Sequence, residues 1–361
     1  MTIPLVDVHS EYAPLKAELE ARFREVLDGG QFIRGPQYHA FQEEAAAYLG
    51  VKKTVGVANG TDALVIVLDA LEIGPGDEVI CPAFTFYATA ESIARRGATP
   101  VFADIDPVTL NLDPEDVAAR ITGRTRAIMP VHLFGRPAAM DELAALDVPL
   151  IEDAAQAFGA PGVAERGIVS TYSFFPTKNL FCLGDGGLVA TSDEELADRV
   201  SVLAFHGSRD KTDFDFVGYN SRLDELQAGF LRIFLTHLDE WNRGRREVAA
   251  RYAELGLGEL VELPEDEVGH IYHLFVCRSP ERDRIRAALV EAGIGTATYY
   301  TTPLHLQPAL SFLGNEPGSL PETERVAAEN FSVPLWPAMP VEAQERVVDV
   351  VRSAAAVTAK A

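Results

Sequence analysis

Cysteine is scarce in this 361-residue chain, which has only Cys81, Cys182 and Cys277. Their number is odd and their spacing is wide, so the sequence contains neither the paired framework of a disulfide-stabilised domain nor a CxxC metal site. We expect each cysteine to be a small buried residue rather than a functional thiol, and we predict no metal site.

Positive charge is also in short supply. Lysine and arginine total 31 against 54 aspartates and glutamates, which gives a formal net charge of −23. A chain this acidic repels nucleic acid and anionic membrane surfaces, so neither is an expected partner. Solubility is the simplest explanation of the charge.

Long apolar runs are absent as well. Residues 1–7 show no basic region followed by an apolar core, and no apolar run reaches the length of a membrane span. Hydrophobic residues make up 47 % and charged residues 24 % of the chain, a composition typical of soluble enzymes. We therefore expect a cytoplasmic protein.

The order of the apolar segments indicates an α/β fold. Between residues 54 and 195, strand-like runs alternate with helical stretches, which is the pattern of a large, mostly parallel sheet. The expected strands are 54–58, 78–81, 101–103, 127–132, 148–153, 171–175 and 188–191. A long helical region over 239–255 links this unit to a second one. We expect a large domain over residues 1–240 and a small C-terminal domain over 241–361, an ordinary domain size.

The turn after the first expected strand suits an anion. The run Asn59-Gly60-Thr61-Asp62 separates that strand from a helix that begins near Ala63. A glycine turn followed by a helix N-terminus presents free N–H groups and the positive end of the helix dipole to a phosphate. The alternative is a plain helix cap made by Thr61 or Asp62, and this short motif on its own favours the cap.

The most informative segment surrounds Lys178. The aromatic and β-branched run that ends at Phe175 is typical of a buried strand, and Pro176 ends it because proline has no N–H for the ladder. Lys178 then lies on a loop at the carboxyl end of the strand, ahead of the glycine-rich turn 184–187.

A lysine in this position has a specific chemistry available to it. Desolvation would lower the pKa of its ammonium group, and a neutral amine can form a Schiff base with an aldehyde. The hydroxyl of Ser173, five residues earlier, suggests that the aldehyde compound also carries a phosphate, as pyridoxal phosphate does. By spacing alone, a solvated surface lysine is the more common outcome.

A carboxylate ends the expected strand 148–153. In a parallel sheet this places Asp153 at the carboxyl edge, where ligands bind, with the amide of Gln156 three residues further on. An aspartate facing a pyridine nitrogen would keep that nitrogen protonated, so that the ring acts as an electron sink. The alternative is a helix N-cap before Ala154, and these residues alone do not decide between the two.

Three aromatic residues, Phe84, Phe86 and Tyr87, lie at a turn between an expected strand and an expected helix. They could offer a flat face to a cofactor ring. We expect at least one of them to pack in the core instead.

Five motifs occur in order along the chain: residues 59–64, 85–89, 152–156, 173–178 and 220–224. In this order they resemble the DegT/StrS family of nucleotide-sugar aminotransferases, which have the fold type I architecture of aspartate aminotransferase. The resemblance runs almost end to end, from residues 32–36 to residues 303–308, and the motifs together are far more specific than any one of them. It implies a large domain with a mostly parallel seven-stranded sheet between helices, and a smaller α+β C-terminal domain.

The resemblance also implies a role for each site residue. Lys178 resembles the Schiff-base lysine that moves the proton in the 1,3-shift, and Asp153 resembles the partner of the pyridine nitrogen. The other implied cofactor contacts are Gln156 near the ring hydroxyl, Phe86 on the ring face, and Gly60, Thr61, Asp62, Ser173 and Asn220 around the phosphate. Asn220 would reach the phosphate in the neighbouring subunit, which implies a homodimer with two shared active sites.

The implied reaction is a two-stage amino transfer. L-glutamate is the expected donor, and the acceptor is a keto group at C-3 or C-4 of a nucleotide-linked deoxy or N-acetylated hexose. The family also contains dehydratases in which histidine replaces the lysine, and Lys178 favours aminotransfer. The alternatives are a sugar dehydratase or other lyase on the same fold, and a regulatory dimer that binds pyridoxal phosphate without turnover.

Two departures from the family pattern bear on the substrate rather than on the cofactor. Gly167 is followed by Ile168 where the family usually has Gly-Asp, and the run 299–301 is Tyr-Tyr-Thr where many relatives have His-Tyr-Pro. The candidates for the substrate pocket are Arg34, Arg222, Tyr299, Tyr300 and His305. Two further histidines are expected to be structural, because a lone histidine is usually a satisfied polar group: His132 and His206.

Overall fold

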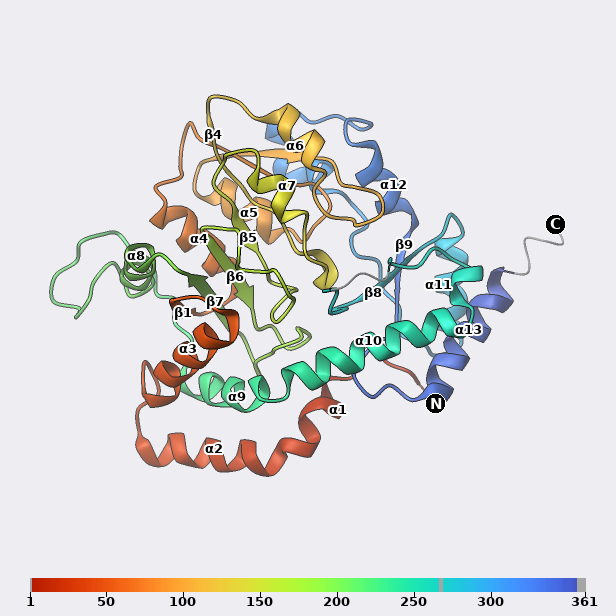
Figure 1. Ribbon diagram of the computed structural model, residues 1–361, viewed down its shortest axis with the longest axis horizontal. Coiled ribbons are helices and arrows are strands. Elements are labelled where there is room, and N and C mark those ends of the chain that lie inside the picture. The colour runs from red at the N-terminus through yellow and green to blue at the C-terminus, as the bar shows by residue number, and fades with distance from the viewer. Residues whose placement is uncertain (1, 266–268, 356–361) are drawn as a thin grey trace.

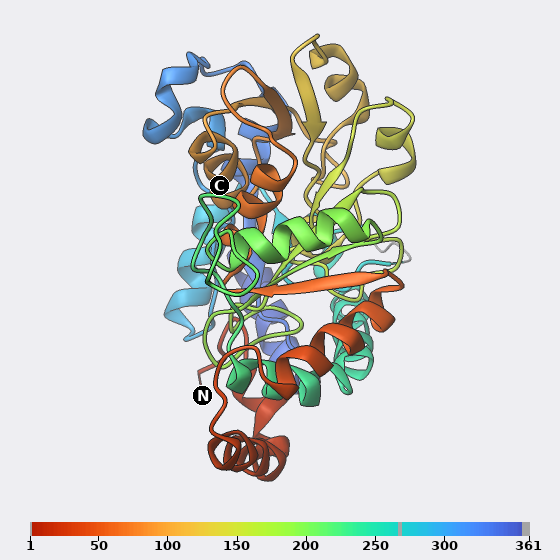
Figure 2. The ribbon, with the colours of Figure 1, turned by 90° about the vertical axis from the view of Figure 1, so that its left-hand side faces the viewer.

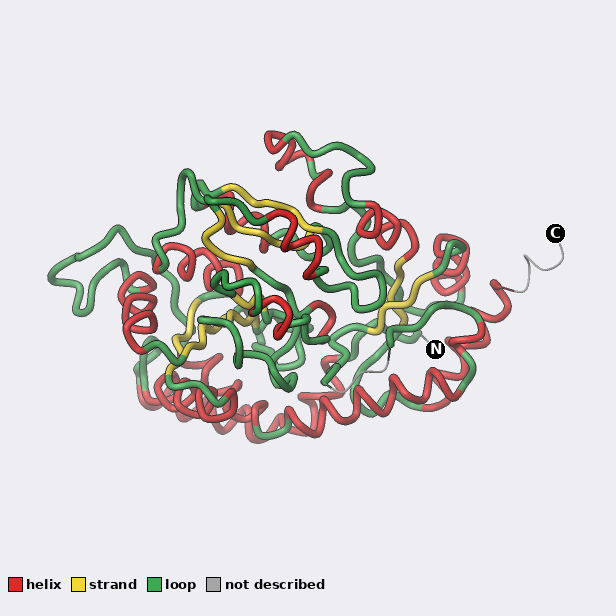
Figure 3. Tube along the Cα trace, turned by 45° about the horizontal axis from the view of Figure 1, so that its top comes forward, coloured by secondary structure: helices red, strands yellow, loops and turns green. Residues whose placement is uncertain are grey.

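The computed structural model describes residues 2–265 and 269–355 (Figure 1). Strands lie in the interior of the molecule and helices lie around them (Figure 3). Within the described residues, no helix is both long enough and apolar enough to cross a bilayer.

The predicted sheet is present, with seven strands. They are β1 Lys53–Val57, β2 Glu78–Pro82, β3 Thr99–Ala103, β4 Thr125–Ile128, β5 Ile151–Asp153, β6 Val169–Ser173 and β7 Gly187–Thr191. Ladders join them in the orders β3-β2-β4 and β5-β6-β7-β1, and β7 alone runs antiparallel to its neighbours. Two isolated parallel bridges, Ile128–Leu150 and Val131–Asp153, connect the two groups of strands.

Prolines account for the break between the two groups. Pro130 and Pro149 lie where the sequence predicted longer strands, and neither can donate a ladder hydrogen bond. Their carbonyls still accept hydrogen bonds, from Asp153 N and Ile128 N, each at 2.9 Å. The sheet therefore stays in register at the edge where Asp153 lies, with fewer backbone hydrogen bonds than a full ladder provides.

Helices cover both faces of the sheet. Those of the first 235 residues are α1 Val8–Tyr12, α2 Lys16–Gly29, α3 Pro36–Leu49, α4 Gly60–Ala70, α5 Ala88–Arg95, α6 Pro114–Arg120, α7 Met140–Ala144, α8 Glu194–Ala204 and α9 Glu225–Leu235. Apolar residues of α4, α5 and α8 share a buried cluster with one face, to which Val57 and Val189 point. Residues of α3 and α9 pack with Tyr172 and Leu188 on the other face. Figure 2 shows α8 and α3 on opposite sides of β1.

The C-terminal part is a smaller α+β unit. It contains α10 Leu238–Glu254, β8 Phe275–Arg278, α11 Arg282–Glu291, α12 Pro321–Glu329, β9 Asn330–Val333 and α13 Val341–Ala355. β8 and β9 pair antiparallel, and α11 packs against α13. The N-terminus joins this unit, because Ile3 N donates to the Gly293 carbonyl (3.0 Å) and Gly295 N donates to the Ile3 carbonyl (2.7 Å).

One long helix belongs to both parts. α10 contributes Leu238 and Trp241 to the cluster under the sheet, and Val248 and Tyr252 to the cluster of the C-terminal unit. In Figure 1 it runs from beside α9 to beside α13, above α2. The domain boundary near residue 240 would fall at the start of this helix, and it stays a prediction.

Candidate active site

Lys178 lies on the turn after β6, at the carboxyl end of that strand. Backbone hydrogen bonds hold the turn, from Lys178 N to the Phe175 carbonyl (2.8 Å) and from Cys182 N to the Phe174 carbonyl (2.7 Å). Desolvation lowers the pKa of Lys178 to about 8, while the charge of Asp153 acts in the opposite direction. A large fraction of the amine is therefore neutral, and able to attack an aldehyde, at mildly alkaline pH.

Asp153 is the last residue of β5 and is only 4 % exposed. Its Oδ2 accepts a hydrogen bond from the Thr89 hydroxyl (2.8 Å), and its Oδ1 accepts one from Ala155 N (3.2 Å). Burial raises the pKa of Asp153, against the effect of these hydrogen bonds and of the charge of Lys178. Residues 154–160 form turns rather than a helix, which removes the alternative of a helix cap at this position.

The N-terminus of α4 forms an anion cradle beside β6. Asn59 caps this helix, because its Oδ1 accepts from Asp62 N at 2.8 Å. The cap that the sequence assigned to Thr61 or Asp62 was therefore placed too far along the chain. Within residues 2–265 and 269–355, the amides of Gly60 and Thr61 donate to no other group, so they are available to a phosphate.

Two glycines allow the helix to approach the strands this closely. A Cβ on Gly60 would lie 2.7 Å from the Cβ of Ser173, and a Cβ on Gly187 would lie 2.4 Å from the carbonyl group of Asn59. The cradle thus exists only because no side chain fills it. Together with the amine of Lys178 and the buried carboxylate of Asp153, it fits pyridoxal phosphate.

A group of aromatic and amide side chains includes Tyr300, which lies close enough to Asp153 to be influenced by its charge. Phe86 is 56 % exposed, and its ring centroid lies 6.2 Å from that of Tyr300. Gln156 Oε1 accepts from Phe134 N (2.7 Å), and its Nε2 donates to the Tyr300 hydroxyl (3.2 Å). Phe84 is buried at 1 %, so one of the three aromatic residues packs in the core, as expected.

Three cations surround a single aromatic ring elsewhere on the surface. Arg34, Lys211 and Arg222 lie 4.6, 4.8 and 5.7 Å from the centroid of Phe205. The negative face of an aromatic ring attracts a cation electrostatically. None of the three forms an ion pair with a carboxylate of the described chain, although that chain is strongly acidic. We call Arg34, Lys211 and Arg222 the Phe205 cation cluster.

Glu225, the first residue of α9, positions this cluster. Its buried carboxylate accepts hydrogen bonds from Gly35 N (3.0 Å), Gln37 N (2.6 Å) and Tyr38 N (3.0 Å), at the start of α3. The loop that carries Arg34 is therefore tied to the segment that carries Arg222. Two antiparallel bridges bring the remaining segments together: Ile33–Asp224 and Phe205–Asn220.

The other candidate residues have mixed surroundings. Asn220 is exposed to solvent. Tyr299 is half-buried, and its backbone N donates to Asn330 Oδ1 (2.9 Å). His305 is 2 % exposed, and its Nε2 lies 3.1 Å from Glu324 Oε1 on α12. Its place in a substrate pocket stays a prediction.

The sequence analysis gave no role to three residues of these sites. Thr89, whose hydroxyl donates to Asp153, lies inside one of the five motifs. Glu225 directly follows another motif, and its hydrogen bonds to residues about 190 positions away leave no local signal. Lys211 lies in a polar loop that has no recognisable pattern.

A lysine at the edge of a mostly parallel sheet, a buried aspartate and an open helix N-terminus define the site of a pyridoxal-phosphate enzyme of the aminotransferase type. The chain belongs to the DegT/DnrJ/EryC1/StrS aminotransferase family, whose model matches residues 14–352.

Individual relatives cover the chain almost completely. A protein of Geobacillus stearothermophilus named as a pleiotropic regulatory protein is 47 % identical over 97 % of each chain. A protein of Acidithiobacillus ferrooxidans named as a UDP-N-acetyl-3-dehydro-α-D-glucosamine 3-aminotransferase is 44 % identical, again over 97 % of each chain. The crystal structure of DesV from S. venezuelae in complex with a ketimine intermediate superposes with a TM-score of 0.94, at 43 % identity and 98 % coverage of each chain.

These likenesses confirm the family, the fold type I architecture and the cofactor that the sequence predicted. Aminotransferases of this family depend on pyridoxal phosphate, and the chain is a pyridoxal-phosphate-dependent aminotransferase. The roles of its individual residues remain proposals.

Proposed function

We propose that this aminotransferase moves an amino group from L-glutamate to the C-3 keto group of a nucleotide-linked deoxy or N-acetylated hexose. The observation that carries the proposal is the placement of Asp153 and Lys178 at the carboxyl ends of the neighbouring parallel strands β5 and β6, with the open N-terminus of α4 beside β6. The relative from Acidithiobacillus ferrooxidans, which is named for amination at position 3 of such a sugar, supports the choice of C-3 over C-4.

Each residue of the site has a defined task in this reaction. Pyridoxal phosphate, when bound, supplies the aldehyde and the electron sink. Nζ of Lys178 takes up the proton that leaves the donor carbon and returns it at the other end of the 1,3-shift. The carboxylate of Asp153 holds the proton on the ring nitrogen. The amides of Gly60 and Thr61 and the hydroxyl of Ser173 bind the phosphate, and the exposed face of Phe86 orients the ring.

The Phe205 cation cluster would bind the diphosphate of the nucleotide. A diphosphate brings two adjacent negative charges, and Arg34 and Arg222 offer planar guanidinium groups that match phosphate oxygens. The cations lack carboxylate partners within the described chain, so a ligand would meet them without first breaking ion pairs.

We further propose that the enzyme is a homodimer whose partner subunit completes each site. Asn220 is exposed, as a residue that reaches into a neighbouring subunit must be. The loop between α8 and Asn220 projects from the body of the molecule (Figure 1). Several large apolar residues on α2 and on nearby loops are exposed and would be covered by a second copy: Phe23, Leu27, Phe32, Ile33 and Leu183.

A panel of nucleotide-linked keto sugars tests the substrate. The enzyme should aminate a 3-keto sugar with glutamate as donor and form 2-oxoglutarate in equal amounts. Faster turnover of a 4-keto sugar would overturn the choice of C-3. Release of water without consumption of glutamate would instead establish the lyase alternative.

The name of the 47 % identical relative favours a second candidate, a regulatory protein. A regulator without turnover would bind pyridoxal phosphate but would not exchange its amino group with glutamate. Conversion of the bound cofactor to its amine form on addition of glutamate, read from the loss of visible absorbance, separates the aminotransferase from the regulator.

A cytoplasmic location remains a prediction.

A further inference from the structure

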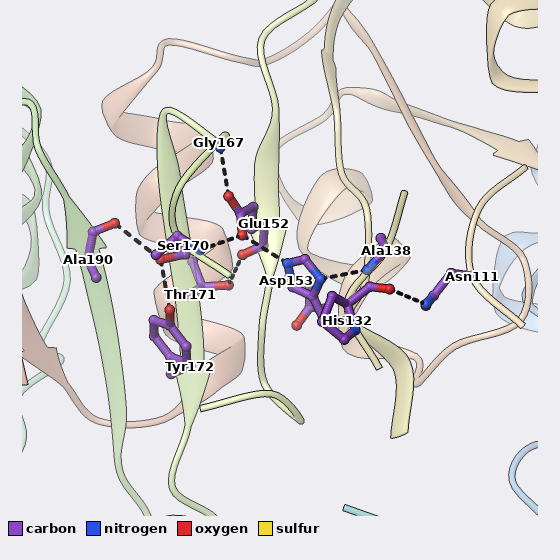
Figure 4. A network of polar contacts seen from close by, with 12 residues as sticks. Asn111, His132, Ala138, Glu152, Asp153, Gly167, Ser170, Thr171, Tyr172 and Ala190 are labelled. Carbon is purple, nitrogen blue, oxygen red and sulfur yellow. Dashed lines mark hydrogen bonds and ion pairs between the residues drawn. The ribbon is translucent and has the colours of Figure 1, made fainter. Parts of the chain in front are cut away.

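A buried polar pair, Glu152 and His132, connects β5 to the segment that follows β4 (Figure 4). Successive side chains of a strand point to opposite faces, so Glu152 points away from the cofactor site. Glu152 and His132 are both fully buried, and Nε2 of His132 lies 2.9 Å from Oε2 of Glu152.

Every partner of the Glu152 carboxylate is a hydrogen-bond donor. Besides His132, these donors are Ala164 N at 2.8 Å from Oε2 and Gly167 N at 2.6 Å from Oε1. Burial on its own would raise the pKa of Glu152, but these hydrogen bonds outweigh it and hold the pKa below its ordinary value. Glu152 is therefore a buried carboxylate that stays ionised.

The imidazole of His132 is equally well defined. Its Nδ1 accepts a hydrogen bond from Ala138 N (3.0 Å), so its Nε2 carries the hydrogen and donates it to Glu152. Both ring nitrogens are used, which fixes the orientation of the ring between two segments of the chain.

The pair lies where the backbone ladder of the sheet is interrupted. Pro130 interrupts the ladder between the segment after β4 and β5, and the backbone of Asp153 is held there by two bonds, Asp153 N to the Pro130 carbonyl (2.9 Å) and His132 N to the Asp153 carbonyl (3.0 Å). The bond from His132 to Glu152 adds a side-chain connection across the same gap. Stability alone would be served as well by two apolar residues of similar volume, because a buried charged pair gains little over them.

We propose that Glu152 and His132 are positioning residues that hold the carboxyl end of β5 in place, and with it the carboxylate of Asp153 against the ring nitrogen of the cofactor. The inference rests on the proposed function, because it assumes that the ring lies against Asp153. Neither side chain touches the reacting atoms.

The variant Glu152→Gln keeps the volume and removes the charge. We expect kcat to fall about tenfold or more, since small displacements of a reacting group are costly, with the KM for glutamate changed less than threefold. The pH at which the visible absorbance of the bound cofactor changes should also fall, because a displaced carboxylate of Asp153 stabilises the protonated form of the cofactor less. The matched control is Glu78→Gln, which removes a buried carboxylate from the amino end of β2, away from the site.

A second variant perturbs Glu152 from outside the core. A Cβ at Gly167, on an accessible loop, would lie 2.6 Å from Oε1 of Glu152, so Gly167→Ala should reproduce the fall in kcat and the spectral shift in a protein that folds. We expect Glu78→Gln to lose thermal stability without a change in kcat. If Glu152→Gln and Gly167→Ala behave in the same way and keep the wild-type absorbance profile, the pair is purely structural and the inference is wrong. Failure of the wild-type protein to bind pyridoxal phosphate would contradict the proposed function instead, and the two failures are distinguishable.

Discussion

At the scale of single residues, the chemistry depends on the protonation of Lys178. Its pKa of about 8 means that the reactive neutral form grows as the pH rises through 8. We predict that the rate at which the apoprotein captures pyridoxal phosphate rises through this pH and then levels off, as measured by visible absorbance in stopped flow. Lys178→Arg, which keeps the charge but cannot deprotonate, should capture none. A rate that falls as the pH rises would contradict the assignment.

A second prediction at the scale of single residues concerns Thr89. Its hydroxyl donates to Asp153 and so favours the ionised carboxylate. In Thr89→Val that support is lost, the pKa of Asp153 rises further, and the acid limb of the pH profile of kcat should move to higher pH. Thr85→Val is the matched control, because Thr85 is also buried and contacts Thr89 (3.4 Å) but is not bonded to Asp153. Equal profiles for the two variants would remove Thr89 from the site.

The residues that sequence reasoning found share a strong local signal. Asp153 ends one apolar strand and Lys178 closely follows another, and strands that run parallel bring their carboxyl ends to one edge, so the sequence could predict that the two residues lie near each other. Glu225 shows the opposite case. Its three hydrogen bonds join α9 to the start of α3, and nothing in the neighbouring sequence indicates which distant amides a carboxylate will meet.

At the scale of elements, Glu225 connects two helices and the loop of Arg34. We predict that Glu225→Gln, which cannot satisfy three backbone donors as a carboxylate does, lowers the free energy of unfolding by about 1 to 3 kcal/mol. The KM for the nucleotide sugar should rise as well, because Arg34 loses its fixed position, while the KM for glutamate stays the same. Urea unfolding and steady-state kinetics test both effects. An unchanged KM for the sugar would separate Glu225 from substrate binding.

The existence of the elements was predicted better than their ends. Alternating apolar segments identified the seven strands of the sheet, but the expected strands 127–132 and 148–153 were shortened at Pro130 and Pro149. Helices α1 and α2 are separated by a 3₁₀ turn over Ala13–Leu15, which contains a proline. In both cases a residue without an N–H ends regular hydrogen bonding that the apolar pattern alone would continue.

At the scale of the whole molecule, mixing subunits of two inactive variants tests whether the active sites are shared between subunits. Lys178→Ala and Asn220→Ala should each be inactive alone. If Asn220 serves the partner's site, each mixed dimer has one intact site, so an equal mixture should recover about a quarter of wild-type activity after random exchange of subunits.

The control for this experiment is a mixture of Lys178→Ala with Asp153→Asn. Both changes lie in the same subunit's site, so every site of a mixed dimer has one defect and no activity should return. No recovery in the test mixture would show that the sites are not shared. Recovery in the control would show that Lys178 and Asp153 of one site come from different subunits.

The long helix α10 has a mechanical consequence. The first turns of α10 pack under the sheet and its last turns pack in the C-terminal unit. The helix therefore connects the two parts rigidly. Any hinge-like closing of the C-terminal unit over a bound sugar would have to bend α10 or break the packing contacts at one of its ends. Most of the adjustment that accompanies substrate entry should therefore occur in the short loops around the site.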